Sequence, residues 1–356
     1  MNYLQPGALN KEAAPPQDSG TAHEDAGLRG TPEPANVKET VTEVMVKGKP
    51  VMMPAIEMGG LTIVVSGRRL KIAAVKDEEF LDGEAIADPG PVIAQLKTTR
   101  LRPDIFTFAQ KLPNVAPRHS YYREWENFAA IPITTYADWL DHRVTYDVRK
   151  AVRRAQRSGV EARKADYDDE LVQGICTVYN ETRYRQGKAF WHYQKDFATV
   201  KKENATFADR ACFIGAYIKG ELVGFIKMVY VGSYAATIQV LSQVKHRREK
   251  ASNAMIAKAV EICVEKGLSH FVYGRYVYNN PDSSLTEFKR RNGFEPILVP
   301  RYYVPLTAKG AIALKFRLHR PLSERIPMSL RPVLHRVRGW LRHKSHDAGE
   351  SDGGVA

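Results

Sequence analysis

The most informative stretch of the sequence is VKHRREKASNAMIAKAVEICVEKG, which runs from Val244 to Gly267. An apolar run typical of a buried strand ends at its start, a basic turn follows, and an amphipathic helix then extends to the glycine. The first amides of a helix attract anions, and neighbouring cations strengthen that attraction. The stretch therefore predicts an anion site between a strand and the helix that follows it.

The flanking elements extend this unit into an α/β (α+β) domain. Three apolar runs precede the basic turn, and a Lys-Gly hairpin turn joins the first two; they cover 211–218, 221–231 and 234–244. A strand at 270–276, a helix at 283–293 and a strand near 294–304 follow it. Upstream, 136–160 reads as one helix capped by Asp138, and 168–187 reads as a second helix closed by Gly187. This order predicts a three-layer sandwich with a mixed central sheet.

The rest of the chain divides by composition. Residues 1–37 and 345–356 have few large apolar side chains and are expected to be disordered tails. Residues 40–132 predict a smaller β-rich lobe, with strands in 41–56, 61–75 and 104–112 and a helix in 88–101. Residues 133–306 form the predicted main domain, and 307–344 form a basic segment.

Composition limits the function classes. The net charge of +13 favours an anionic partner, such as a phosphorylated metabolite, RNA or lipid headgroups. The three cysteines are isolated, so neither a disulfide framework nor a metal site is expected. No apolar run has the roughly 20 residues of a membrane span, and the first residues do not follow the order of a signal peptide. We therefore expect a cytoplasmic protein.

Three stretches resemble a known family. RKAVRRAQRSGVE (149–161), ETRYRQG (181–187) and EFKRRNGFEP (287–296) are similar to segments of the FemAB-type and BioF2-like branch of the GNAT acyltransferase superfamily. The resemblance covers about residues 131–306 and implies a GNAT fold, with 40–132 as a degenerate copy of it. It implies transfer of an acyl group from acyl-CoA (acetyl-CoA), or of an aminoacyl group from aminoacyl-tRNA, onto an amine. The alternative is a non-catalytic GNAT-fold protein that binds RNA or an anionic membrane surface.

The resemblance implies a donor site at the basic turn. The GNAT pattern R/Q-x-x-G-x-G/A places Arg248 first, Ala251 at the first glycine and Asn253 at the second. A left-handed conformation at Ala251 would cost about 1 kcal/mol or more, whereas Asn253 tolerates it better. The residues expected to bind the donor are Leu241, Gln243, Val244, Arg247, Arg248, Lys250, Ala251, Ser252 and Asn253. The alternative is a solvated turn capped by Ser252.

Catalytic and acceptor residues are expected beside this turn. Lys289 stands where many GNAT enzymes have a tyrosine, and the FemAB resemblance implies that it stabilises an oxyanion or holds a phosphate; the alternative is an exposed helix lysine. Arg275 and Tyr276 end a strand, where α/β sheets commonly bind ligands. The residues predicted to contact substrate are Arg183, Trp191, His192, Gln239, Asn279 and Phe288. The loop that contains Arg183, Trp191 and His192 could instead serve packing, and Gln239 could either face a cleft or be buried and bonded to backbone.

The C-terminal segment suggests a further partner. From residue 328 onward, apolar and arginine positions predict a basic amphipathic helix that either lies on an anionic membrane or docks on the protein. The expected partners are therefore an amine-bearing small molecule or cell-envelope precursor, tRNA, and an anionic membrane contacted through residues 315–344. A membrane contact would place the protein at the inner face of the membrane.

Overall fold

The computed structural model describes residues 37–46, 49–185, 187–278 and 281–320. The predicted tails up to residue 36 and beyond residue 344, Asn279, and the predicted helix from residue 328 lie outside the described residues. Among the residues described, no helix is long and apolar enough to cross a membrane.

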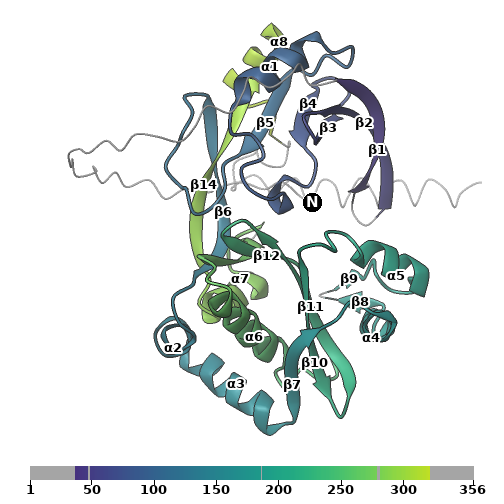
Figure 1. Ribbon diagram of the computed structural model, residues 1–356, viewed down its shortest axis with the longest axis vertical. Coiled ribbons are helices and arrows are strands. Elements are labelled where there is room, and N and C mark those ends of the chain that lie inside the picture. The colour runs from purple at the N-terminus through teal and green to yellow at the C-terminus, as the bar shows by residue number, and fades with distance from the viewer. Residues whose placement is uncertain (1–36, 47–48, 186, 279–280, 321–356) are drawn as a thin grey trace, which may run out of the picture.

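The described strands form one large mixed sheet of 12 strands. Their order is β1-β2-β3-β4-β5-β14-β6-β13-β12-β11-β10-β7, and Figure 1 shows β14 and β6 connecting the two halves of the molecule. Their bounds in that order are Lys38–Val46, Lys49–Met58, Leu61–Ser66, Ile72–Val75, Ile105–Ala109, Glu295–Pro305, Tyr122–Pro132, His270–Arg275, Tyr234–Ser242, Glu221–Val231, Ala211–Ile218 and Val160–Ala165. A separate two-stranded ladder joins β8 (Tyr184–Arg185) to β9 (Lys188–Ala189).

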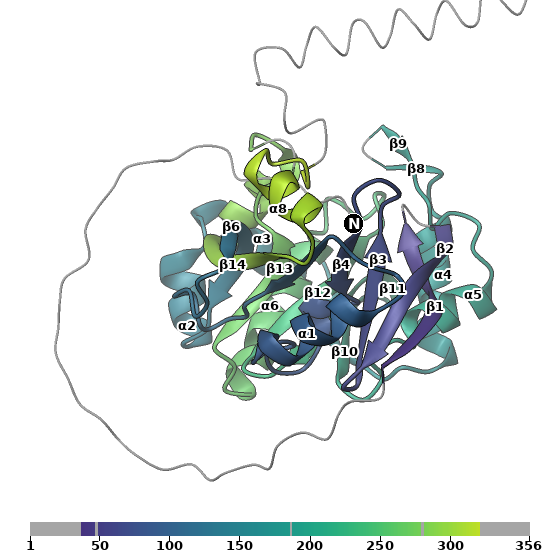
Figure 2. The same ribbon diagram turned by 90° about the horizontal axis from the view of Figure 1, so that it is seen from above.

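The N-terminal half of the sheet, β1 to β5, has its own apolar core. Ile56, Ile63, Leu96 and Phe106 are fully buried in it, together with Tyr302 from β14. Helices α1 (Pro89–Thr98) and α8 (Ala308–Lys315) lie over this half, as the view from above shows (Figure 2). This confirms the predicted β-rich region with one helix between its strands.

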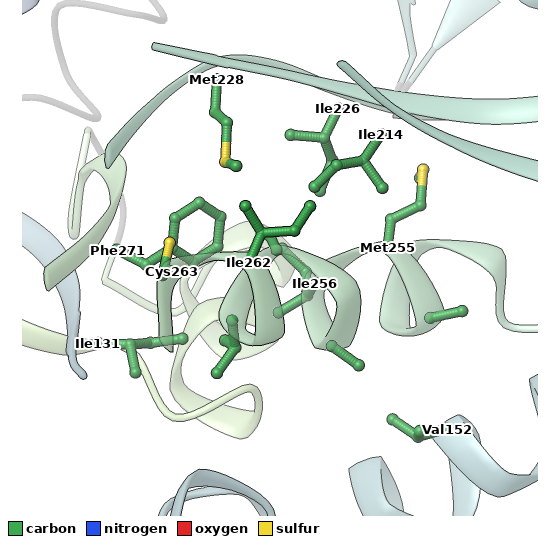
Figure 3. Close-up of a cluster of buried hydrophobic side chains, with 14 of the residues drawn as sticks. Ile131, Val152, Ile214, Ile226, Met228, Met255, Ile256, Ile262, Cys263 and Phe271 are labelled. Carbon is green, nitrogen blue, oxygen red and sulfur yellow. The ribbon is translucent and has the colours of Figure 1, made fainter. Parts of the chain in front are cut away.

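The C-terminal half is the predicted three-layer sandwich. Helices α3 (Tyr146–Arg157) and α6 (Ala251–Glu265) cover one face, and α4 (Asp169–Asn180) and α5 (Phe197–Asn204) cover the other (Figure 1). Side chains alternate along a strand, so neighbouring residues belong to opposite faces. Ile214 and Ile226 point toward α6 (Figure 3), while the residues just before them, Phe213 and Phe225, join the core under α4. The predicted Lys-Gly turn joins β10 and β11, with Lys219 at φ 52° and Gly220 at φ 82°.

The two helices predicted upstream need correction. Residues 136–160 do not form one helix: a short α2 (Tyr136–Asp138) and a π turn (Trp139–Arg143) end at Val144, which is extended and buried. Thr135 and Thr145, rather than Asp138, occupy the N-cap positions of α2 and α3. The buried indole of Trp139 fixes this break, because its Nε1 donates a hydrogen bond to the carbonyl of Asn292 (3.0 Å).

The second helix also ends earlier than predicted. α4 stops at Asn180, and the side chain of this residue bonds both the preceding turn, at the carbonyl of Cys176, and the amide of Gln194. Gly187 therefore lies in the turn between β8 and β9, at φ 72°, and closes no helix. Strands β6 and β7 were not predicted, and β6, which precedes the expected boundary at residue 132, lies between β14 and β13.

Candidate functional site

Strand β12 separates from its parallel neighbour β13 after a short contact. The two strands pair only from Tyr234 to Ala236. A bulge in β12 follows. Met228 of β11 opposes Thr237, and the adjacent Lys227 opposes Gln239. Ile238 is therefore the extra residue of the bulge. From Thr237 to Ser242, the edge of β12 that faces β13 has no strand partner among the described residues. This opening leads along β12 to the basic turn.

The basic turn is held by a carboxylate of the protein. The amides of Val244 and Lys245 donate hydrogen bonds to Glu181 at 2.7 and 2.8 Å, and Arg185 pairs with the same carboxylate. Arg185 also donates to the carbonyl of Ser242, so the end of α4 is tied to the end of β12. The turn is thus anchored at its first residues, whereas the cations that follow, Arg247 and Arg248, are exposed.

The start of α6 overturns the predicted strain at Ala251. Lys250 takes the left-handed conformation, at φ 61°, and Ala251 is the first helical residue, with 2% of its surface exposed. Asn253 is helical too, and its Nδ2 donates to Oδ1 of Asn292 (3.0 Å). Ser252 is not the cap: its hydroxyl bonds the Ser242 hydroxyl instead (2.8 Å).

Two amides at this helix start are available to a ligand. Within the described part of the chain, the N–H groups of Ala251 and Ser252 have no hydrogen-bond acceptor. The first amides of a helix lack acceptors within the helix and point toward its N-terminal end. Together with the exposed cations, they can bind a phosphate.

Lys289 is not the exposed helix lysine of the alternative interpretation. It is 0% exposed in α7 (Ser284–Arg291), and its Nζ donates to the carbonyl of Arg275. The amine lies 4.8 Å from the ring centres of both Tyr273 and Tyr278. Burial lowers the pKa of Lys289 to about 7.

Tyr276 and Phe288 pack against the hydrophobic core under α6. Their predicted roles in catalysis and substrate contact stay predictions.

Two of the predicted substrate residues meet in one cluster. Nε2 of Gln239 donates to Nε2 of His192 (3.0 Å), and the hydroxyl of Tyr179 donates to Oε1 of Gln239 (2.8 Å). The imidazole contacts the rings of Tyr179 and Trp191, whose centres lie 4.1 and 3.6 Å away at tilts of 31° and 33°. Desolvation, followed by the charges of Lys195 and Arg185, lowers the pKa of His192 to about 3, so the ring is neutral.

The outer part of this cluster reaches solvent. Trp191 is 51% exposed and Arg183 lies over the ring of Tyr184, 5.8 Å from its centre. Tyr179 was missed in the sequence because a tyrosine on an apolar helix face reads as a packing residue. Gln239, which was expected either to face a cleft or to bond backbone, bonds two side chains instead.

A cavity of about 190 Å³ lies where β12 and β13 separate, between the two halves of the sheet. Its walls come from the segment after β4, from the end of β5, and from β6, β12, β13 and β14. Arg301 bridges two buried carboxylates, at 2.9 Å to Glu78 and 2.8 Å to Glu126, and Arg275 also pairs with Glu126. Burial raises the pKa of Glu78, whereas Arg301 and Arg275 outweigh desolvation and lower the pKa of Glu126.

Two further carboxylates line the cavity without a partner. The side-chain carboxylates of Asp77 and Glu79 have no hydrogen-bond or ion-pair partner among the residues that the structure describes. Desolvation and the neighbouring charge of Glu126 raise the pKa of Glu79 to about 7. These residues were missed because nothing in the sequence KDEEF links the N-terminal half of the sheet to a site as far along the chain as Thr237. No group of three His, Cys, Asp or Glu side chains among the described residues could hold a metal ion.

Comparisons with known proteins agree with this fold. A family model described as an acetyltransferase (GNAT) domain matches residues 142–290, while no curated protein matches the chain. Among solved structures, FemX is similar with a TM-score of 0.50 and 10% identity, over 78% of this chain and 90% of FemX. The C-terminal domain of a putative lysylphosphatidylglycerol synthetase from Agrobacterium fabrum and L-PGS from Bacillus licheniformis have TM-scores of 0.46 and 0.47. Both are 15% identical over 72% of this chain and are covered to 84% and 85%.

These matches support the predicted GNAT fold and, in general terms, the predicted acyl transfer. FemX has a low identity to this chain, so its likeness concerns the fold alone, and the BioF2-like part of the resemblance stays a prediction. The separated strands, the basic turn and the helix α6 all lie within the matched family region. Residues 142–290 therefore match the acetyltransferase (GNAT) domain model, and the fold of the chain is similar to that of FemX.

Proposed function

We propose that this protein is an N-acyltransferase that moves an acyl group from acyl-CoA onto an amine. The unpaired edge of β12, which leads from Thr237 to the free amides of Ala251 and Ser252, carries this proposal. An extended amide-containing arm can add to such an edge as a strand would. The phosphates at the end of the arm would then reach the start of α6 and the cations before it.

The reaction needs mainly positioning and polarisation. An acyl group that lies at the bulge of β12 would have its carbonyl next to backbone amides that are free of a strand partner, and such amides stabilise a developing oxyanion. Holding the amine against that carbonyl supplies most of the remaining rate enhancement. The polarising amides would then lie near Ile238.

The choice of acyl-CoA over aminoacyl-tRNA rests on the helix start. The main objection to CoA was strain at Ala251, and that residue is helical and unstrained. The match to an acetyltransferase family also favours CoA. The rival donor is an aminoacyl-tRNA, with a cell-envelope precursor as the amine, and the exposed cations Arg247 and Arg248 could bind its phosphates as well.

Calorimetric titration tests the donor. We expect acetyl-CoA to bind the wild type, and the double variant Arg247→Gln, Arg248→Gln to bind it about tenfold more weakly, because two phosphate-binding cations are lost. Arg153→Gln on α3 is the matched control, since this arginine is exposed on another surface. Heat absent at millimolar acetyl-CoA would remove the CoA proposal, and heat on titration with aminoacyl-tRNA would then identify the rival donor.

A second candidate is a non-catalytic RNA-binding protein. The cations Lys150, Arg153, Arg154 and Arg157 are exposed on α3, and no acidic side chain of the described residues pairs with them. RNA bound there should dissociate steeply as salt increases. Turnover of any acyl donor by the purified protein would exclude this candidate.

A membrane contact through residues 315–344 is a further proposal. Most of residues 315–344 lies outside the described residues, and the described beginning docks on the protein. His319 and Arg320 both bind Glu124 of β6, at 2.9 and 2.6 Å. Co-sedimentation with anionic vesicles, with and without the residues after Arg320, would test whether the rest of the segment binds lipid.

A further inference from the structure

The cavity between the two halves of the sheet has the features of an amine site. It lies at the point where β12 and β13 separate, which is where the proposed acyl group would meet its acceptor. Its volume of about 190 Å³ is well above the roughly 10–15 Å³ that one water molecule needs. Asp77 is exposed and Tyr278 is 39% exposed, so the cavity reaches the protein surface. An aminoalkyl group can therefore enter it.

The charges of the cavity are arranged for a cation. Arg301 and Arg275 are committed to Glu78 and Glu126, and Lys111 donates to the carbonyl of Leu81. These contacts leave Glu79 and Asp77 as the carboxylates without a partner among the described residues. A partly buried carboxylate that lacks a partner gains stability from a bound ammonium group, which supplies both charge and hydrogen-bond donors.

A second polar group in the cavity wall also lacks a partner. Thr237 lines the cavity at the bulge, is only 7% exposed, and its hydroxyl has no hydrogen-bond partner among the described residues. Buried hydroxyl groups are normally hydrogen-bonded, so the wall of the cavity contains, at Thr237, a polar group whose hydrogen-bonding capacity is unused.

We propose that the acceptor is a primary amine, that its ammonium group binds in this cavity, and that Glu79 holds it and accepts its proton. This inference rests on the proposed acyltransferase function. Glu79 takes one proton from the ammonium group, and the neutral nitrogen attacks the carbonyl carbon of the donor. The C–N bond forms, the C–S bond of the thioester breaks, and a second nitrogen proton passes to the departing sulfur. The amide and the free thiol leave, and Glu79 releases its proton to water.

The environment of Glu79 suits this role. Its pKa of about 7 lies near neutral pH, where a general base is most effective. The other titratable or charged groups that face the cavity are Asp77, Glu78, Lys111, Glu126, Tyr234, Arg275, Tyr278 and Arg301. Among these, Lys111 has a pKa that is lowered to about 8, mainly by desolvation. Because Lys111 and Glu79 titrate in the same pH range, a pH effect is assigned to Glu79 by comparing the wild type with a Glu79 variant.

Binding of n-butylammonium, followed by NMR titration, tests the site without any need for turnover. We expect Glu79→Gln to weaken this binding by at least about tenfold, because a charged hydrogen-bond acceptor is lost. Glu57→Gln, on the exposed side of β2, is the matched control and should bind like the wild type. Equal binding by Glu79→Gln and the wild type would overturn the proposed amine site.

Transfer from acetyl-CoA to n-butylamine tests the proton step. The wild-type rate should rise with pH through a limb near pH 7, and Glu79→Gln should lower kcat/KM by about 100-fold or more and lose that limb. A limb retained in Glu79→Gln would overturn the role as base. Acetyl-CoA titration of Glu79→Gln separates the two proposals, because this variant should bind acetyl-CoA as the wild type does. A wild type that neither binds nor uses acetyl-CoA would refute the proposed function. The n-butylammonium titration would still test the amine site in that case.

Discussion

Two neighbouring residues at the start of α6 should respond in opposite ways to replacement by glycine. Ala251 is helical and 2% exposed, so Ala251→Gly removes a buried methyl group, worth about 0.8 kcal/mol. It also adds the conformational cost of glycine in a helix, about 0.5–1 kcal/mol. Lys250 is left-handed, a conformation that costs an L-residue roughly 1–2 kcal/mol. In Lys250→Gly this strain is released, and the greater freedom of the unfolded chain offsets only part of the gain.

Guanidinium unfolding of both variants measures these free energies. We expect Ala251→Gly to lower the free energy of unfolding by about 1–2 kcal/mol. Lys250→Gly should raise it by about 0.5 kcal/mol or slightly more. Acetyl-CoA titration should show no gain of affinity for Ala251→Gly, although this change restores the glycine of the GNAT pattern. A stable Ala251→Gly variant that binds acetyl-CoA tenfold more tightly would refute the reasoning, because it would mean that residue 251 must adopt the left-handed conformation.

Three further changes test contacts described above. Glu181→Ala should lower the free energy of unfolding by about 1–3 kcal/mol in urea, because two amides of the basic turn lose their acceptor, and an equal loss in the exposed control Glu161→Ala would contradict this. Arg301→Met should cost about 3–5 kcal/mol, since buried Glu78 loses its ion-pair partner and buried Glu126 keeps only Arg275, and a variant as stable as the wild type would contradict this. Lys289 has a folded-state pKa of about 7, below its unfolded value, so the unfolded chain binds more protons between these values and stability rises with pH there. Measured from pH 7 to 9.5, the unfolding free energy of the wild type should therefore rise more steeply than that of Lys289→Met, by up to about 1.4 kcal/mol per pH unit, and parallel curves would contradict the lowered pKa.

The local parts of the fold could be predicted from the sequence. The runs around Ile214, Ile226 and Val240 are apolar enough to specify strands, and the basic turn before Ala251 correctly indicated a strand followed by a helix. The conformation within that turn could not be predicted. Alignment to the GNAT pattern implied a left-handed residue at 251, whereas the chain places it one residue earlier, at Lys250.

The non-local parts could not be predicted. Val144 interrupts the predicted long helix because the indole of Trp139 is anchored on Asn292, a contact between residues far apart in the chain. The same limit applies to the cavity, since Glu79 and Thr237 meet only because β14 and β6 join the two halves of the sheet. Strand pairing of this kind depends on tertiary packing rather than on local sequence.

The position of β14 also sets the order in which the protein can fold during synthesis. This strand is the neighbour of both β5 and β6, and the amide of Arg118 donates to the hydroxyl of Tyr302, 184 residues later in the chain. A nascent chain therefore presents the facing edges of β5 and β6 without a partner until nearly all of the described residues have been made. Unpaired strand edges of this kind promote aggregation and slow folding. We therefore expect chains that end before residue 295 to be captured by chaperones, even though they already contain the whole matched GNAT region.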